Sequence, residues 1–283
     1  MRSESNKIDF RKNVFISILI IVLLWLVTLC FVVPANGLTL GEVAFGEHRS
    51  PKNIARNGFR NPVKTLEFFQ LKEDMTVVEL WPGSSGWYTE ILAPYLKDNG
   101  LLYTVNFDGS TGLDYFERGA TRFQDMLNSD PSMFGKVINM PLMPPKAVPA
   151  IQSGTVDLVV TFRNMHNWLM RDMEQDVLSF AYSVLKPKGI LGVVAHRSQD
   201  DQLGRAGAST GYLGQSFVID LVEGFGFKLA ESSDINLNLK DSTNHPKGVW
   251  SLPPRLRLGD ENKDRYTEIG ESNRMTLKFV KLQ

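Results

Sequence analysis

The sequence predicts an α/β protein with a doubly wound, mostly parallel sheet of seven strands, a reversed last strand and, ahead of the sheet, an N-terminal hydrophobic helix. Short apolar runs alternate with helical runs from residue 75 to residue 231, and this alternation is typical of βαβ units. The run at 275–281 has the pattern of a strand but follows a long polar loop at about 232–273 instead of a helix. The composition, 43% hydrophobic and 22% charged, is that of an ordinary globular protein and excludes disorder or collagen for the whole chain.

Apolar runs and turn residues locate the individual elements. Strands are expected at 75–80, 101–106, 136–139, 156–161, 190–195, 227–231 and 275–281. Helices are expected at 87–96, 115–127, 171–185 and 215–224. The last strand is expected to pair antiparallel beside the sixth, because no crossover helix precedes it.

Residues 14–33 form an uncharged run of twenty residues behind a short basic segment. A helix rises about 1.5 Å per residue, so this run matches the roughly 30 Å core of a bilayer, and the basic flank predicts that the remainder of the chain crosses the membrane. Two outcomes stay open. The length favours an uncleaved anchor in the inner membrane that faces the periplasm, whereas the small residues before Asn36 favour a signal cleaved after Ala35 and release into the periplasm.

Three segments are therefore predicted: a membrane anchor or signal at 1–35, a linker and N-terminal extension at 36–62, and the α/β domain at 63–283. Cys30, the single cysteine, lies in the first segment, so the domain is expected to have no disulfide, thiolate metal site or cysteine nucleophile. The four histidines show no metal-ligand spacing, and no metal is expected. The 31 basic residues balance 31 acidic ones, which removes the simplest argument for a nucleic-acid partner.

The turn after the first strand is the strongest candidate for a binding site. In a doubly wound sheet the ligand lies beyond the carboxyl ends of the strands, and glycines before a helix let a ligand approach the backbone. Here Glu79 is followed by Trp81, Pro82, Gly83 and Gly86. The turn lacks the lysine of a phosphate-binding loop, the spacing of a serine nucleophile elbow and the glycines of a dinucleotide fingerprint. A tight turn that binds nothing stays open as the alternative.

The run VVELWPGSSGWYTEIL at 77–92 resembles the first motif of class I S-adenosylmethionine-dependent methyltransferases. Together with TFRNMHNW at 161–168, LKPKGILGVVAHR at 185–197 and GESNRMTLKFVK at 270–281, it resembles predicted bacterial methyltransferases with exported N-termini, over roughly residues 50–283. The resemblance implies a Rossmann-like methyltransferase fold, transferase activity and S-adenosyl-L-methionine as cofactor.

The resemblance also implies a set of cofactor-binding residues. Glu79 would lie near the methionine part of the cofactor, and Asn106 or Asp108 would face its ribose. The full set is Glu79, Pro82, Gly83, Gly86, Tyr88, Asn106, Asp108, Arg163 and Asn164. Two positions depart from the common motif, because Trp81 and Ser85 stand where glycines are usual.

His166 and His196 are the candidate catalytic residues, since each follows a predicted parallel strand at the same edge of the sheet. An imidazole with a pKa near neutrality can accept a proton from an acceptor hydroxyl or amine. Arg163, Asn164 and Arg197 are expected to converge on the same cleft. The alternative is that Asn167 or Asn164 caps the next helix and His166 bonds a backbone carbonyl.

The late loop contains two further features. Residues 241–250 form a stretch long enough to cover the cleft, and the charged run at 255–265 is expected to be a solvated face. The sequence thus favours methyl transfer from S-adenosylmethionine to an unknown small-molecule acceptor, outside the cytoplasm or at the membrane. The alternative is a non-catalytic, membrane-anchored ligand-binding protein that retains the fold.

Overall fold

The computed structural model describes residues 37–283, so the predicted anchor or signal segment lies outside the described residues. Within residues 37–283, no helix is both long enough and apolar enough to cross a membrane. Residues 38–283 form one compact unit.

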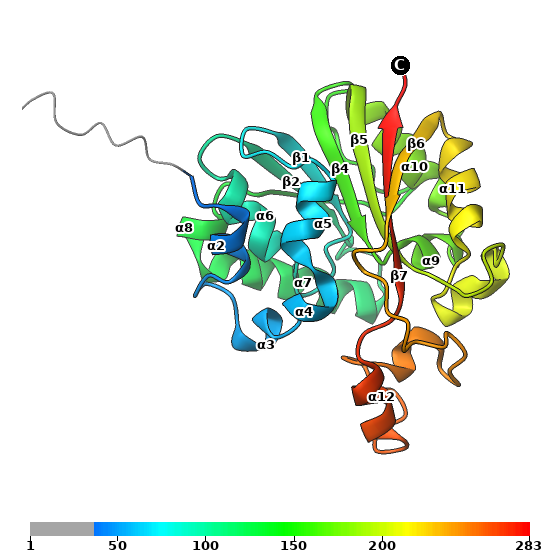
Figure 1. Ribbon diagram of the computed structural model, residues 1–283. Coiled ribbons are helices and arrows are strands. Elements are labelled where there is room, and N and C mark those ends of the chain that lie inside the picture. The colour runs from blue at the N-terminus through cyan, green and yellow to red at the C-terminus, as the bar shows by residue number, and fades with distance from the viewer. Residues whose placement is uncertain (1–36) are drawn as a thin grey trace, which may run out of the picture. The chain divides into compact units, whose positions relative to one another are not determined.

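Seven strands form one mixed sheet in the order β3-β2-β1-β4-β5-β7-β6 (Figure 1). The strands are β1 Thr76–Leu80, β2 Leu101–Asn106, β3 Ile138–Pro141, β4 Val156–Phe162, β5 Leu185–His196, β6 Phe227–Ser233 and β7 Arg274–Lys281. Strands β1 to β5 are parallel, and β7 runs antiparallel to both β5 and β6. The predicted mixed sheet with a reversed last strand is therefore confirmed, and β7 pairs beside β6 as expected while also inserting against β5.

Helices cover both faces of the sheet (Figure 1). They are α2 Leu40–Ala44, α3 Pro51–Ile54, α4 Asn57–Arg60, α5 Pro62–Phe68, α6 Thr89–Leu96, α7 Asp114–Ser129, α8 Pro131–Phe134, α9 Met165–Leu169, α10 Glu174–Val184, α11 Gln215–Glu223 and α12 Lys263–Ile269. Short 3-10 helices occur at Arg205–Thr210 and Gly248–Ser251.

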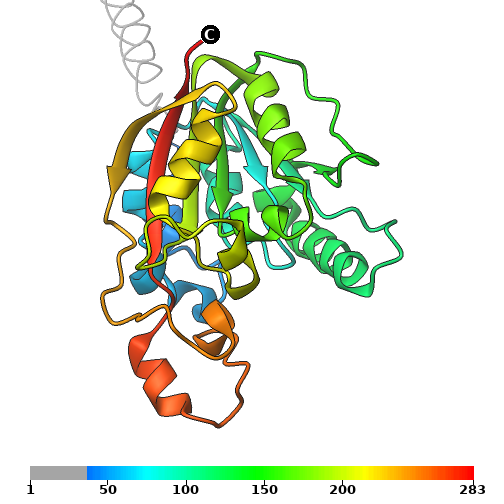
Figure 2. The same cartoon turned by 90° about the vertical axis from the view of Figure 1, so that its right-hand side faces the viewer.

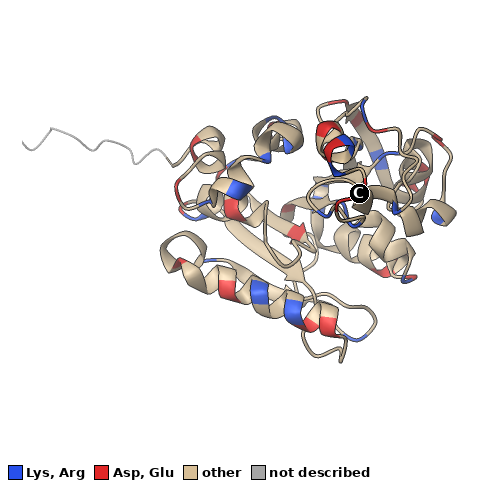
Figure 3. Ribbon diagram, turned by 90° about the horizontal axis from the view of Figure 1, so that it is seen from below, with Lys and Arg blue, Asp and Glu red and all other residues tan. Residues whose placement is uncertain are grey.

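The strands have apolar side chains on both faces of the sheet, because helices cover both faces and bury them. Successive side chains alternate between two buried clusters: Val78 and Val159 belong to one, and Val77 and Leu158 to the other. This is the pattern expected of strands covered by helices on each face. On α7, in contrast, charged residues of both signs lie along the outer face (Figure 3).

Of the segment expected to be a linker and N-terminal extension, 36–62, the structure describes residues 37–62, which contain the short helices α2, α3 and α4 and pack on the rest of the domain. Arg49 is buried and donates to the carbonyl of Ala44, to Asn57 Oδ1 at 3.0 Å and to Glu90 Oε2 at 3.2 Å. Thr39 and Glu42 form a capping box at the start of α2. Polar side chains of this segment form hydrogen bonds with buried groups of the domain. A solvated linker would have a similarly polar composition, so composition alone does not distinguish the two.

Several boundaries differ from expectation, two of them by three residues or more. The helix expected from residue 171 begins at Glu174, because the short helix α9 precedes it. Strand β5 begins at Leu185 instead of residue 190, since Leu185 already pairs with Val156 of β4, and the register then shifts before Ile190 pairs with Leu158.

Gly192 in β5 tests how closely the helical layer approaches the sheet. A Cβ added there would lie 2.7 Å from the ring of Phe69, which is fully buried. We expect Gly192→Ala to lower the free energy of unfolding by about 1–3 kcal/mol, because the ring cannot move without disturbing the core. The matched change Gly58→Ala, where nothing lies within 4 Å, should be neutral or stabilising by up to about 1 kcal/mol. Denaturant unfolding measures both, and equal midpoints for the two variants would contradict this packing.

Candidate functional site

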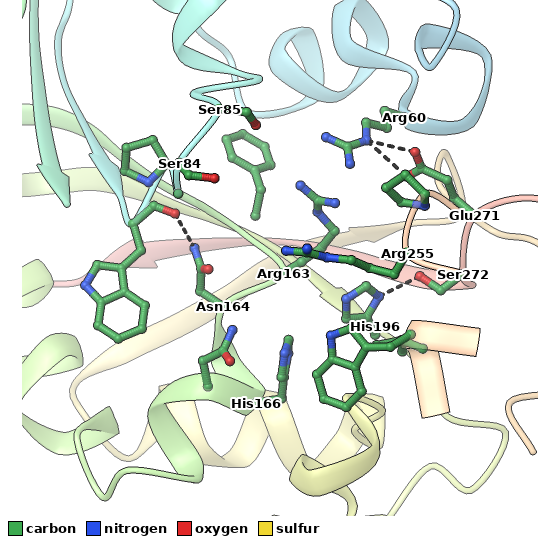
Figure 4. Close-up of a pocket in the computed structure, with 18 of the residues that line it drawn as sticks. Arg60, Ser84, Ser85, Arg163, Asn164, His166, His196, Arg255, Glu271 and Ser272 are labelled. Carbon is green, nitrogen blue, oxygen red and sulfur yellow. Dashed lines mark hydrogen bonds and ion pairs between the residues drawn. The ribbon is translucent and has the colours of Figure 1, made fainter. Parts of the chain in front are cut away.

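A pocket of about 480 Å³ opens at the carboxyl ends of β1, β4 and β5 (Figure 4). The strand order reverses between β1 and β4, which is where doubly wound sheets bind ligands. Several parts of the chain line it: the N-terminal helical segment at 52–60, the turn at 82–85, the segments after β2 and β4, the end of β5, and the late loop with the start of β7. Because β6 ends and β7 begins at this edge, the late loop and α12 lie below the carboxyl ends of the parallel strands (Figure 2).

Trp81 follows β1 directly and has a left-handed backbone with φ of 48°. Its ring is 3% exposed and packs edge-on against Phe107, with ring centroids 5.1 Å apart. Its indole N–H donates to the carbonyl of Leu142 at 2.9 Å. The tryptophan therefore borders the pocket while its ring packs into the core, where its packing and hydrogen bond offset the backbone strain.

Asn106, at the end of β2, braces the glycine turn. Its Nδ2 donates to the carbonyl of Gly83 at 3.0 Å, and its Oδ1 accepts from the N–H of Gly83 at 3.3 Å. Asp108 accepts from Ser110. Neither Asn106 nor Asp108 lines the pocket, whereas Pro82 and Gly83 do.

Glu79 is 1% exposed and lies outside the residues that line the pocket. Its Oε2 accepts from Thr89 Oγ1 at 2.6 Å. Burial raises the pKa of Glu79 to about 8, although the hydrogen bond and Arg163 act against the shift. The carboxyl group is therefore largely protonated at neutral pH.

Tyr88 and Gly86 also lie away from the pocket. Tyr88 is buried and stacks on Phe162, with ring centroids 3.5 Å apart. Gly86 sits against α7, where an added Cβ would lie 2.3 Å from Met126 Cε. The predicted cofactor-binding roles of Glu79, Gly86 and Tyr88 stay predictions, and each of these residues makes contacts that hold the turn and its helix.

Asn164 ties the end of β4 to the turn after β1. Its Nδ2 donates to the carbonyls of Leu80 at 2.9 Å and Trp81 at 3.0 Å, and to Thr161 Oγ1 at 3.1 Å. Arg163 beside it lines the pocket and has a left-handed backbone with φ of 66°. Both strands at the reversal point thus end in a strained, non-glycine residue.

His166 and His196 lie together in the pocket, with ring centroids 5.4 Å apart. His196 Nδ1 is 2.6 Å from Ser272 Oγ, and Trp250 stands edge-on to His166. Burial and then Arg163 lower the pKa of His166 to about 3, and burial and His166 hold the pKa of His196 well below its usual range. Both rings are therefore neutral at pH 7 and able to accept a hydrogen bond.

Four of the five residues expected on the acceptor side line the pocket, namely Arg163, Asn164, His166 and His196. Arg197 instead bonds Gln215 and Asp234 and is not part of the lining. The loop 241–250 contributes Val249 and Trp250 to the lining, in keeping with its expected place over the cleft.

A cluster of arginines around Glu271 completes the wall, and sequence reasoning missed it. Glu271 pairs with Arg56 Nε at 2.6 Å, with Arg60 Nε at 3.0 Å and with Arg274. Burial acts to raise the pKa of Glu271, but Arg274, Arg60 and Arg163 together outweigh it and hold the pKa well below its usual range. The run at 270–281 was part of the resemblance, but nothing in it indicates partners some 215 residues away.

The whole fold is similar to solved structures of low sequence identity. A SAM-dependent methyltransferase from Aquifex aeolicus superposes with a TM-score of 0.55 at 13% identity, over 86% of this chain and 99% of that chain. A SAM-dependent methyltransferase from Methanosarcina mazei gives 0.51 at 11% identity, over 77% and 97%. The [4+2]-cyclase SpnF gives 0.55 at 13% identity, over 84% and 85%. No protein-family model and no curated protein matches the chain. The likeness establishes the methyltransferase-type fold.

The pKa of Glu79 predicts a pH-dependent stability. In the unfolded chain the group titrates near 4.5, so between pH 4.5 and 8 the folded protein keeps a proton that the unfolded chain releases, and the free energy of unfolding falls as the pH rises through that window. Glu79→Gln cannot ionise and still accepts from Thr89. From pH 4.5 to pH 8, the free energy of unfolding of Glu79→Gln should therefore rise relative to that of wild type by on the order of 4 kcal/mol.

Denaturant unfolding at pH 5 and pH 8 measures this gain. Glu47→Gln, a change at an exposed carboxylate, serves as the control and should leave the pH dependence unchanged. If wild type and Glu79→Gln keep a constant difference across the window, Glu79 ionises freely in the fold and the burial argument is wrong.

Proposed function

We propose that this protein transfers a methyl group from S-adenosylmethionine to a small-molecule acceptor bound in the pocket. One observation carries the proposal: the glycine turn after β1 opens into a pocket at the reversal point of a methyltransferase-type sheet. Within residues 37–283, the backbone N–H groups of Ser84 and Ser85 bond no acceptor, and α6 follows them. This is a suitable place for the carboxylate of the cofactor, since free N–H groups near a helix N-terminus attract anions.

The rest of the pocket fits the cofactor through aromatic and polar walls instead of acidic ones. Phe107, Tyr115 and Phe162 line the side next to the turn and offer surface for the adenine ring. The carboxylate in the lining, Glu271, is engaged by arginines, and Glu79 is buried against Thr89. The amino group of the cofactor would therefore be held by backbone carbonyls and neutral side chains.

Methyl transfer mainly requires that the protein align the acceptor with the methyl group of the cofactor. When bound, S-adenosylmethionine supplies a methyl group activated by attachment to sulfur, and most of the remaining barrier is lowered by holding the acceptor in line with it. His166 has a neutral ring in the pocket and can accept the proton that an acceptor hydroxyl or amine loses. His196, held by Ser272, borders the same space and helps to orient the acceptor.

We also propose that residues 14–33 take the domain out of the cytoplasm. The support is the uncharged twenty-residue run behind a basic flank. An exported domain would need a supply of a cofactor that is made in the cytoplasm, so location and cofactor binding are tested separately below.

The cofactor proposal predicts that the full chain binds S-adenosylmethionine and S-adenosylhomocysteine, measured by calorimetry and thermal shift. Ser84→Phe should weaken binding at least tenfold, because the ring fills the space beside the free N–H groups of the turn. Ser153→Phe, in an exposed loop outside the pocket, should leave binding unchanged. A folded protein that shows no heat and no shift with either ligand up to millimolar concentration rules out this function.

The location proposal predicts that the full chain fractionates with the membrane and keeps residues 14–33 in the mature protein. N-terminal sequencing of the native protein checks this. A mature chain that starts at Asn36 in the periplasmic fraction would replace the anchor by a cleaved signal, and recovery of the full chain in the cytoplasmic fraction would overturn export altogether.

A further inference from the structure

The pocket is strongly positive although the chain as a whole is neutral. Seven of its lining residues are basic and one is acidic, an excess of six positive charges. The basic residues are Lys52, Arg56, Arg60, Arg163, Arg171, Arg255 and Arg274. The acidic residue is Glu271, and the two histidines are neutral. Charges of one sign in a cleft with low-dielectric walls attract a ligand of the opposite sign.

Part of this charge is buried and unsatisfied. Arg60 and Arg274 are each 2% exposed, and both share the single carboxylate of Glu271 with Arg56. Within the described chain, Arg60 Nη1 and Arg274 Nε are buried and have no hydrogen-bond partner. Buried donors are normally satisfied, so unpaired ones beside a pocket indicate groups that a ligand completes.

Two further arginines line the pocket: Arg255, which is exposed, and Arg163, which is partly buried. Figure 4 shows their side chains reaching the same space from opposite walls, with Arg60 above them. In residues 37–283 each of the two bonds through its backbone N–H, to Val194 and Leu252 respectively, while its guanidinium meets no acceptor. Burial and Arg274 lower the pKa of Arg163 to about 10, so it stays charged at neutral pH.

The strained backbone of Arg163 also indicates that this residue has a functional role in the pocket. A non-glycine residue with φ of 66° is costly, and such residues persist where the fold holds a functional group in place. Guanidinium forks match the geometry of carboxylates and phosphates, and two forks aimed at one point bind such groups better than scattered lysines would.

We infer that Arg60, Arg163 and Arg255 form an anion-binding subsite, and that the pocket takes a small organic molecule bearing a carboxylate or a phosphate group. A second hollow of about 560 Å³ provides room for the body of that molecule, and it shares with the pocket the residues Tyr115, Asn167, Arg171, Trp250 and Arg255. That this molecule is the methyl acceptor rests on the proposed function, whereas the subsite itself does not.

An anion in the subsite would also prepare the pocket for the reaction. It offsets the charge of Arg163, which contributes to the low pKa of His166, so the pKa of His166 rises and the ring becomes a stronger base. The same anion reduces the repulsion between the arginines and the positive sulfonium of the cofactor. Anion and cofactor should therefore bind with positive coupling.

The test is titration of the full chain with inorganic phosphate and with citrate, at constant ionic strength set with sodium chloride and read by thermal shift and calorimetry. Both anions should stabilise the protein saturably. Arg255→Gln and Arg163→Gln should each weaken anion binding about 10- to 100-fold, because each removes a charge-assisted contact. The control Arg122→Gln, at an exposed arginine of α7 outside the pocket, should bind as wild type does.

The outcomes separate the two proposals. If phosphate and citrate act no more strongly than chloride, or if Arg255→Gln binds them like Arg122→Gln, the subsite does not exist. Arg255 is exposed, so this comparison holds even if Arg163→Gln fails to fold. Anion binding without any cofactor binding leaves the subsite standing and removes the methyltransferase function. If both bind but the anion leaves the affinity for S-adenosylmethionine unchanged or weaker, the anionic acceptor is refuted.

Discussion

Glu271 accepts hydrogen bonds from arginines that enter the domain from opposite ends of the chain. Arg56 and Arg60 belong to the helical segment before the sheet, and Arg274 begins the last strand. Without the carboxylate, the like charges of two buried arginines and of the half-buried Arg56 would face one another, which is strongly destabilising. The N-terminal helices are thereby fixed over the carboxyl edge of the sheet, and the wall of the pocket depends on that placement.

On the other side of the pocket, two asparagine side chains hold the backbone in place through hydrogen bonds. Asn164 holds the end of β1 through two backbone carbonyls, and Asn106 holds the glycine turn through both atoms of its amide. These braces keep Trp81 and Arg163 in left-handed conformations at the ends of β1 and β4. Neutral amides suit this role because they satisfy donors and acceptors together without adding charge to an already positive site.

The electrostatic character of the pocket distinguishes it from a site built around acidic residues. Glu79 is largely protonated beside Thr89, and the carboxylate that remains in the lining neutralises arginines. An anionic group bound beside the cofactor would reduce the repulsion between a cationic cofactor and the positive pocket. The proposed methyl transfer and the proposed anionic acceptor therefore depend on the same balance of charge.

Periodicity and turn chemistry in the sequence by themselves determined the alternating strands and helices, the reversed last strand and the position of the glycine turn. They also placed His166 and His196 at the same sheet edge, because strand ends that follow parallel strands meet there. The tertiary structure alone decided that residues 38–62 belong to the same compact unit as the sheet, that Arg255 lines the pocket, and that Glu79 faces Thr89. These features depend on contacts between residues far apart in the chain and on the direction of individual side chains, and neither local pattern nor spacing encodes them.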